Sequence, residues 1–173
     1  MKLLKKITDK DFGGTDEISC ANPSIKARAV LLDENDCMAL LCLHKLKWNN
    51  YNDLYMIPGG SIEAGESLEK ALEREMLEET GCHINIIEEV GYIEENCAKE
   101  DYVQITHYYL AKVTGKKGQP QMTEVEIEQQ TELQWHSLEK ALDIIANQVA
   151  DGLPSIKLRD KTALSEVIKH LRK

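Results

Sequence analysis

The stretch that decides the fold runs from Gly59 to Cys82 and reads GGSIEAGESLEKALEREMLEETGC. Within it, apolar residues recur at helical spacing, at Leu68, Ala71, Leu72 and Met76. Ser67 is a residue type that caps the start of a helix, and Gly81 can adopt the left-handed conformation that ends one. The pattern therefore predicts a helix over residues 67–80.

Three carboxylates of this helix, Glu75, Glu78 and Glu79, share the stripe of the apolar residues that should face the core. At about 100° per residue they fall within an arc of about 100°. Like charges at this spacing repel one another, and burying them unpaired is costly. Arg74 neutralises only part of the charge. A hard divalent cation completes the neutralisation, and all-oxygen ligands select Mg²⁺ or Mn²⁺ over zinc. The alternative is a solvated surface helix, which the shared stripe argues against.

The segment before the helix, Pro58-Gly59-Gly60, has the composition of a ligand-binding turn. Proline stiffens the entry, and two glycines let the backbone come close to a ligand. The carbonyl of Gly60 can add another hard oxygen ligand. The turn and the helix therefore point to one metal-binding unit.

The same residues resemble the signature of the Nudix hydrolases over residues 60–82. The matching positions are Gly60, Glu66, Arg74-Glu75-Met76, Glu78-Glu79 and Gly81-Cys82. Cys82 is the one departure, since the family usually has a bulky aliphatic residue there. The flanking strand order also resembles the family over residues 26–150. The resemblance implies an α/β fold, an α/β/α sandwich with a mixed central sheet.

The resemblance also implies a chemistry: hydrolysis of a nucleoside diphosphate linked to another group, by water attack on phosphorus, with Mg²⁺ or Mn²⁺ as cofactor. The implied metal-binding residues are Gly60, Glu66, Glu75, Glu78 and Glu79. In this assignment Glu66 acts through a water or by orienting Arg74. We call residues 60–82 the box, and in the same assignment Arg74 fixes the rotamers of the box glutamates Glu75, Glu78 and Glu79. Glu78, Glu79 and Arg74 are the catalytic candidates within the box.

A further catalytic glutamate is expected before the last strand, as in many members of the family. The candidates are Glu124, Glu126, Glu128 and Glu132. Glu128 is our assignment, with a box glutamate as the alternative base, and any one of the four is equally well a solvated loop charge.

Four positions are candidates for substrate contacts: Arg28, Tyr55, Gly59 and Gly60. Arg28 reaches a phosphate or lies exposed on its strand. Tyr55 precedes the turn, where packing is the stronger interpretation. Tyr102, Tyr108 and Tyr109 offer base stacking, although tyrosines in strands are usually core residues.

The rest of the chain predicts alternating strands and helices in a single domain over residues 1–173. Expected strands are 3–7, 84–93, 102–113 and 132–135, with a hairpin of 27–32 and 37–43; expected helices are 67–80, 138–149 and a C-terminal helix within 155–173. Residues 1–25 form an N-terminal extension. Trp135 is expected in the core beneath the last helix.

Composition excludes several classes of protein. The 173 residues are 42% hydrophobic and 29% charged, with a net charge of −9, which is typical of a soluble domain and argues against nucleic-acid binding. No apolar run approaches the roughly 20 residues of a membrane span, and the early polar residues argue against a secretory signal. We therefore expect a cytoplasmic protein that needs no membrane.

Five cysteines without a CxxC pair argue against a disulfide framework and a zinc finger. His44 and His136 show no constellation with a cysteine or serine, so nucleophilic catalysis lacks support.

The expected partner is a small nucleoside diphosphate derivative, such as a nucleoside triphosphate, a nucleotide sugar or a dinucleotide polyphosphate. A homodimer is plausible, because both chain ends extend beyond the box domain. A non-catalytic nucleotide-sensing domain is the alternative; such domains usually lose box glutamates, and none is missing here.

Overall fold

The computed structural model describes residues 1–15, 18, 22–50, 52–98 and 101–172. The strands are β1 (Leu3–Thr8), β2 (Ser24–Leu32), β3 (Cys37–Leu43), β4 (Leu54–Met56), β5 (Gly59–Ser61), β6 (His83–Cys97), β7 (Tyr102–Thr114) and β8 (Thr131–Ser137). The α-helices are α1 (Leu68–Thr80), α2 (Glu124–Glu128), α3 (Leu138–Asn147) and α4 (Pro154–Leu171), and two short 3₁₀ helices are η1 (Asp9–Phe12) and η2 (Lys47–Asn49).

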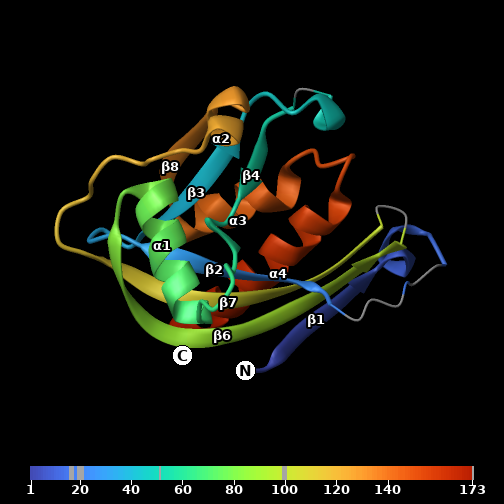
Figure 1. The fold of residues 1–173 in the computed structure, drawn as a ribbon, viewed down its shortest axis with the longest axis horizontal. Coiled ribbons are helices and arrows are strands. Elements are labelled where there is room, and N and C mark those ends of the chain that lie inside the picture. The colour runs from blue at the N-terminus through green and yellow to red at the C-terminus, as the bar shows by residue number, and fades with distance from the viewer. Residues whose placement is uncertain (16–17, 19–21, 51, 99–100, 173) are drawn as a thin grey trace.

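The strands form a mixed sheet in the order β1-β6-β7-β2-β3-β4, with β5 on β2 and β8 on β3. β1 runs parallel to β6 and β2 runs parallel to β7, whereas the other pairs are antiparallel. β2 and β3 form the predicted hairpin, but their register is the single pair Leu32–Met38. The hairpin arms therefore diverge, and β3 joins β4 and β8 away from the long strands β6 and β7 (Figure 1).

Helices cover both faces of this sheet, as the predicted α/β/α sandwich requires (Figure 1). Leu72 and Met76 of α1 pack against Leu31 and Tyr109 on one face. On the other face, Ile145 of α3 and the apolar side of α4 pack against Leu40 and Tyr108, and share a core cluster with Ile7 of β1. The expected N-terminal extension is thus partly built into the sheet.

The predicted carboxylate helix is confirmed at both ends. The Ser67 side chain accepts a hydrogen bond from the backbone N–H of Lys70 at 3.3 Å. Gly81 has a φ of 68°, in the left-handed region, and its N–H donates to the Leu77 carbonyl at 3.0 Å. Ser67 and Gly81 therefore fix the length of α1 locally.

Several expectations differ from the structure. β6 continues to Cys97, beyond the predicted 93, and β4, β5 and α2 were not predicted. The final helix starts at Pro154, which occupies its first turn, where no intrahelical N–H is needed. α3 ends at Asn147, before the predicted 149. Trp135 packs in the cluster of α1 and not beneath α4, because it pairs with Ala39, whose side chain belongs to the α1 face.

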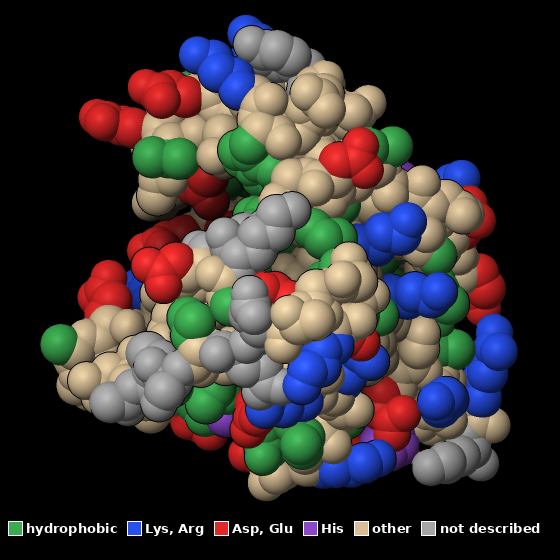
Figure 2. Space-filling model, turned by 90° about the vertical axis from the view of Figure 1, so that its right-hand side faces the viewer, with side chains coloured by type: hydrophobic (Ala, Val, Ile, Leu, Met, Phe, Trp, Pro, Cys, Tyr) green, Lys and Arg blue, Asp and Glu red, His purple; other side chains and the backbone are tan. Residues whose placement is uncertain are grey.

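Charge is unevenly spread over the surface. Figure 2 shows a face on which Lys and Arg side chains gather toward the right and the lower part, although the whole chain carries a net charge of −9. No helix among the described residues is long and apolar enough to cross a membrane.

Candidate active site beside the helix α1

Strand pairing places the Pro58-Gly59-Gly60 turn against the middle of the sheet. β5 pairs with β2 so that Gly59 lies opposite Arg28 and Gly60 lies opposite Ala27. The chain then returns as α1, which contacts both β2 and β5. The turn and the carboxylate helix, adjacent in sequence, therefore share one site.

Both glycines of the turn are required by close contacts. Gly59 has a φ of 131°, and a Cβ there would lie 2.2 Å from the Ala27 carbonyl oxygen. Its N–H donates to Oε2 of Glu79 at 2.5 Å. At Gly60, a Cβ would lie 2.4 Å from Oε1 of Glu75. The missing side chain of Gly60 thus leaves room for the Glu75 carboxylate, and that of Gly59 lets the turn lie directly against β2.

The three box glutamates differ in burial. Glu79 is only 7% exposed, and the side chains of Glu75 and Glu78 are 13% and 43% exposed. Burial raises the pKa of Glu79 to about 8, against the opposing charge of Arg28. Burial also raises the pKa of Glu75, against the hydrogen bond and charge of Arg74. The predicted inward stripe holds for Glu75 and Glu79, while Glu78 lies at its edge.

Arg74 links four of the neighbouring polar groups. Its Nε and Nη2 donate to the two carboxylate oxygens of Glu66 at 3.1 and 3.0 Å. Its Nη1 donates to Glu75 at 2.8 Å and to Glu78 at 3.2 Å, and Nη2 also donates to the Ser61 carbonyl at 3.0 Å. The Glu66 hydrogen bonds are the largest cause of a raised Arg74 pKa. Both oxygens of Glu66 are thus engaged by Arg74.

This donor set fits a hard divalent cation. Glu75, Glu78 and Glu79 supply carboxylate oxygens, and only one guanidinium bonds directly to any of them in the described structure. Gly60 leaves open the space next to Glu75 that a side chain would fill. Oxygen ligands of this kind suit Mg²⁺ and Mn²⁺.

Arg28 is buried and not exposed on its strand. Its Nη1 donates to the Ile57 carbonyl. Its Nε has no hydrogen-bond partner among the residues that the structure describes. A buried guanidinium with a free donor, in register with Gly59, is suited to binding an anionic oxygen.

A cavity of about 380 Å³ adjoins Arg28. Three cationic side chains (Lys26, Arg28, Arg159), two polar ones (Tyr102, Gln104) and apolar residues of β4 and α4 line it. Burial lowers the pKa of Lys26 to about 8, with the charges of Arg28 and Arg159 adding to the effect. The cavity therefore combines an aromatic ring and apolar surface with cationic groups, two of which lie on β2, the strand that also pairs with the Gly59-Gly60 turn.

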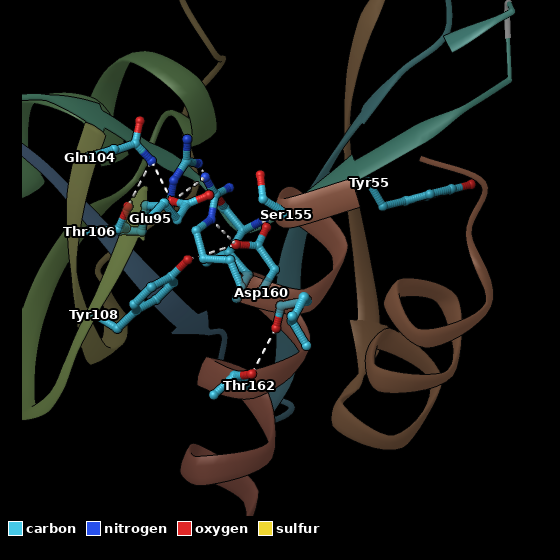
Figure 3. A network of polar contacts seen from close by, with 12 residues as sticks. Tyr55, Glu95, Gln104, Thr106, Tyr108, Ser155, Asp160 and Thr162 are labelled. Atoms are coloured by element: carbon cyan, nitrogen blue, oxygen red, sulfur yellow. Dashed lines mark hydrogen bonds and ion pairs between the residues drawn. The ribbon is translucent and has the colours of Figure 1, made fainter. Parts of the chain in front are cut away.

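A buried polar network that includes Glu95, Tyr108 and Asp160 (Figure 3) holds Arg159, which lines this cavity. Asp160 accepts hydrogen bonds from Tyr108 at 2.7 Å, from the Ile57 N–H at 3.0 Å and from Nε of Arg159 at 2.8 Å. Glu95 lies 3.5 Å from Nη1 of Arg159. Burial opposes ionisation of Asp160, but the charges of Arg159 and Arg28 outweigh it and lower its pKa. Nη2 of Arg159 has no partner in the described part of the chain.

Sequence reasoning missed this network, although a signal was present. Asp160 lies on the stripe of α4 that Ile156, Ala163 and Leu164 define as buried. A charged residue on an apolar helical stripe indicates a partner across the core. The stripe of α4 therefore carries the same kind of signal as the stripe of α1.

Two predicted site residues lie elsewhere. Tyr55 points away from the polar network in Figure 3, and its neighbour Met56 lines the cavity instead. Glu128 lines a separate hollow with Trp48 and Val125. Among the acidic residues of α2, it is the charge of Glu126 that contributes to the raised pKa of Glu79.

The three tyrosines considered for stacking separate clearly. Tyr108 and Tyr109 are fully buried core residues, whereas Tyr102 lines the cavity. Tyr102 is therefore the one of the three that is placed to contact a ligand.

Known proteins resemble this chain in sequence and in structure. A family model described as "NUDIX domain" matches residues 23–155. The chain is 31% identical over 65 residues to an oxidized purine nucleoside triphosphate hydrolase of Danio rerio, a match that covers 38% of this chain and 37% of that protein.

Solved structures share the fold at low identity. A NUDIX hydrolase from Nitrosomonas europaea aligns with a TM-score of 0.65 and 18% identity, over 86% of this chain and 90% of that one. A MutT protein from Methanosarcina mazei Go1 gives 0.60 and 22%, over 90% and 100%. A UDP-X diphosphatase gives 0.58 and 15%, over 88% and 66%. The box residues, the sandwich and the extent of the family match together show that this chain belongs to the Nudix family.

Proposed function

We propose that this protein is a pyrophosphohydrolase that cleaves the diphosphate linkage of a nucleoside diphosphate bonded to another group. Water attacks phosphorus, and Mg²⁺ or Mn²⁺ is required. The observation that carries the proposal is the cluster on α1, where Glu75 and Glu79 are buried beside the Gly59-Gly60 turn and Arg74 offsets only part of the charge.

Glu75, Glu78 and Glu79, with the Gly60 carbonyl, are the residues that would hold the ion. When bound, a divalent ion supplies charge stabilisation to the phosphoryl oxygens and lowers the pKa of a bound water. An acidic site of this kind accepts a polyanionic diphosphate only when its own charge is reversed.

The chain's own residues orient the reacting groups. The Gly59 N–H holds the Glu79 carboxylate, and Arg74 holds Glu75 and Glu78. Glu66 acts here by orienting Arg74, since both its oxygens accept hydrogen bonds from that guanidinium. Such outer contacts fix ligand rotamers before substrate binds. Arg74 is accordingly a positioning residue.

The proton acceptor is a box glutamate or a glutamate of α2. From the sequence we assign Glu128; Glu126, whose charge adds to the raised pKa of Glu79, is the alternative within α2. Glu126 also accepts hydrogen bonds from Thr123 at the start of α2. Its release from that cap would be needed before it could accept a proton from water.

The substrate-binding surface that we propose is the cavity beside Arg28. Free donors on Arg28 and Arg159 can bind anionic oxygens, and Tyr102 offers a face for a base or sugar. Two of the similar proteins are named for a nucleoside triphosphate and for UDP-X. These names, and the cationic wall, favour a nucleoside diphosphate that carries a further phosphate or another group.

Several wider expectations stay predictions: a single domain over residues 1–173, a cytoplasmic location and a homodimer. A net charge of −9 favours a small-molecule substrate over nucleic acid.

A phosphate-release screen tests the proposal across nucleoside triphosphates, nucleotide sugars and dinucleotide polyphosphates, each with and without Mg²⁺. A coupled phosphatase detects released monophosphates. We expect metal-dependent turnover of at least one class. Tight nucleotide binding with no turnover of any class would instead support the nucleotide-sensing alternative.

A further inference from the structure

A second group of metal-ligand side chains lies at the edge of the sheet where β3, β4 and β8 meet. Cys42, near the end of β3, is in register with Tyr55 of β4 on one side and with Glu132 of β8 on the other. His44 follows β3, and Asp53 precedes β4. Pairing of β3 with β4 thus brings Cys42 and His44 close to Asp53, and pairing with β8 adds Glu132 from far along the sequence.

The donor atoms of Cys42, His44 and Asp53 converge. Sγ of Cys42 lies 3.7 Å from Nδ1 of His44, and that nitrogen lies 2.9 Å from Oδ1 of Asp53. All three ligand atoms lie within 4.8 Å of one another. Zinc bonds of about 2.0–2.3 Å in tetrahedral geometry separate neighbouring ligand atoms by roughly 3.3–3.7 Å. An ion therefore fits after shifts of about 1 Å or less in side-chain positions.

The kinds of ligand select the ion. A thiolate and an imidazole favour zinc and similar transition metals, whereas Mg²⁺ prefers oxygen ligands. The carboxylate set on α1 has the opposite preference, because all its donors are oxygens. The two groups would therefore hold different metals.

Outer contacts orient the histidine ring in the way that metal-binding histidines require. The second nitrogen, Nε2 of His44, faces Oε2 of Glu132 at 3.4 Å. Glu132 in turn accepts a hydrogen bond from Nε2 of Gln134 at 2.8 Å. With a metal on Nδ1, the ring donates Nε2–H to Glu132, and this fixes the tautomer.

The geometry excludes a Cys-His-Asp nucleophile and leaves two of the three ligands, His44 and Asp53, accessible to solvent. A catalytic triad places the nucleophile and the acid on opposite ring nitrogens, but here Nδ1 faces both Cys42 and Asp53. Cys42 has no exposed surface for a substrate. The side chains of His44 and Asp53 are 34% and 50% exposed, so solvent can supply a fourth ligand. The sequence did not reveal that Cys42 lies against His44, but this contact lends no support to nucleophilic catalysis.

We propose that Cys42, His44 and Asp53 form a second metal site, which binds a zinc-type transition-metal ion independently of the site on α1.

Cobalt spectroscopy of the full chain tests this directly. The metal-free protein, kept reduced with a phosphine, is titrated with Co²⁺ in excess Mg²⁺, which saturates oxygen-only sites. We expect visible ligand-field bands of tetrahedral cobalt and a thiolate-to-cobalt charge-transfer band. One equivalent of Zn²⁺ should remove both, and further Mg²⁺ should remove neither.

Matched variants assign the ligands. His44→Gln should abolish the tetrahedral bands, whereas His83→Gln, at an exposed histidine outside the cluster, should retain them. Cys42→Ser should remove the charge-transfer band, whereas Cys37→Ser, elsewhere on β3, should not. Glu132→Gln should weaken zinc binding by about 10–100-fold.

Two results would overturn the proposal. One is wild-type protein whose bound Co²⁺ shows only six-coordinate oxygen spectra or no binding. The other is His44→Gln protein that keeps the wild-type bands. Because Cys42 is buried, the Cys42→Ser protein can fail to fold. In that case His44→Gln and Asp53→Asn, which change partly exposed side chains, test whether these residues bind the metal.

Discussion

At the residue scale, the two most informative side chains are Glu75 and Glu79. Their carboxylates lie within a few ångströms of backbone that only glycine permits, at Gly60 and Gly59. Arg28 and Arg74 offset part of their charge, yet burial still raises the pKa of both carboxyls. A charge buried at such cost, without full compensation from the protein, indicates a functional position.

Glutamine substitutions test the box directly. Glu78→Gln and Glu79→Gln should each lower metal-dependent turnover by more than the roughly 10–100-fold typical of lost outer contacts, because a ligand charge disappears. Unfolding free energies in chelator should stay at wild-type level or rise, because repulsion decreases. The exposed Glu73→Gln on the same helix is the control and should retain activity. Full activity in both box variants would refute the metal assignment.

Arg74→Lys tests geometry separately from charge. Lysine keeps the positive charge but cannot donate to both oxygens of Glu66 while also reaching Glu75 and Glu78. We expect kcat to fall about 10–100-fold, with the circular dichroism spectrum unchanged. Wild-type kcat in this variant would show that the guanidinium fork has no positioning role.

At the scale of elements, the sequence predicts the bounds of a helix correctly where the residues at its own ends fix them. Ser67 and Gly81 gave α1 its correct bounds, because caps act within one turn. The arms of the β2–β3 hairpin were also found, but their divergence was not, since it depends on pairing with β7 and β8. Likewise, the side of the sheet that Trp135 faces follows from its register with Ala39, which the sequence does not show.

The C-terminal cap of α1 offers a test at this scale. Gly81→Ala should lower the free energy of unfolding by at least about 1–2 kcal/mol, the usual cost of left-handed backbone without glycine. A Cβ there would also lie 2.6 Å from the Gly118 backbone. Gly65→Ala is the matched control, because Gly65 has a φ of 81° and its added Cβ would meet no atom within 4 Å among the described residues. If urea unfolding gave Gly81→Ala and Gly65→Ala the same loss of unfolding free energy, the close contact with Gly118 would be unimportant for stability.

At the scale of the whole molecule, contacts across the sheet complete the site. Arg159 and Asp160 come from α4, and most of that helix lies beyond the residues 23–155 that the family model matches. Arg159 nevertheless lines the cavity. The box residues could be identified from the sequence because they lie within one short stretch. The cavity wall could not, because it combines strands and a helix that are far apart in the chain. The Cys42–His44–Asp53 cluster could not either, because it depends on the register in which β3 pairs with β4.

Asp160→Asn tests the link between α4 and the sheet. It removes a counter-charge from buried Arg159, so we expect a loss of about 3–5 kcal/mol in unfolding free energy at neutral pH. The folded pKa of Asp160 lies below its ordinary 3.8. The stabilisation is therefore complete above that ordinary value and is lost as pH falls through the folded value. Urea unfolding from neutral to strongly acidic pH should show this loss of unfolding free energy in wild type and a smaller loss in the variant. The same loss in both proteins at acidic pH would contradict this prediction.

The acidic cluster of α1 lies inward, we infer, because it holds a divalent ion; a crystal soaked in Mn²⁺ and measured for anomalous scattering tests this. We predict one or more manganese peaks at about 2.1 Å from carboxylate oxygens of Glu75, Glu78 and Glu79, with the Gly60 carbonyl adjacent. No peak at this cluster, with the three carboxylates turned out into solvent, would contradict the account.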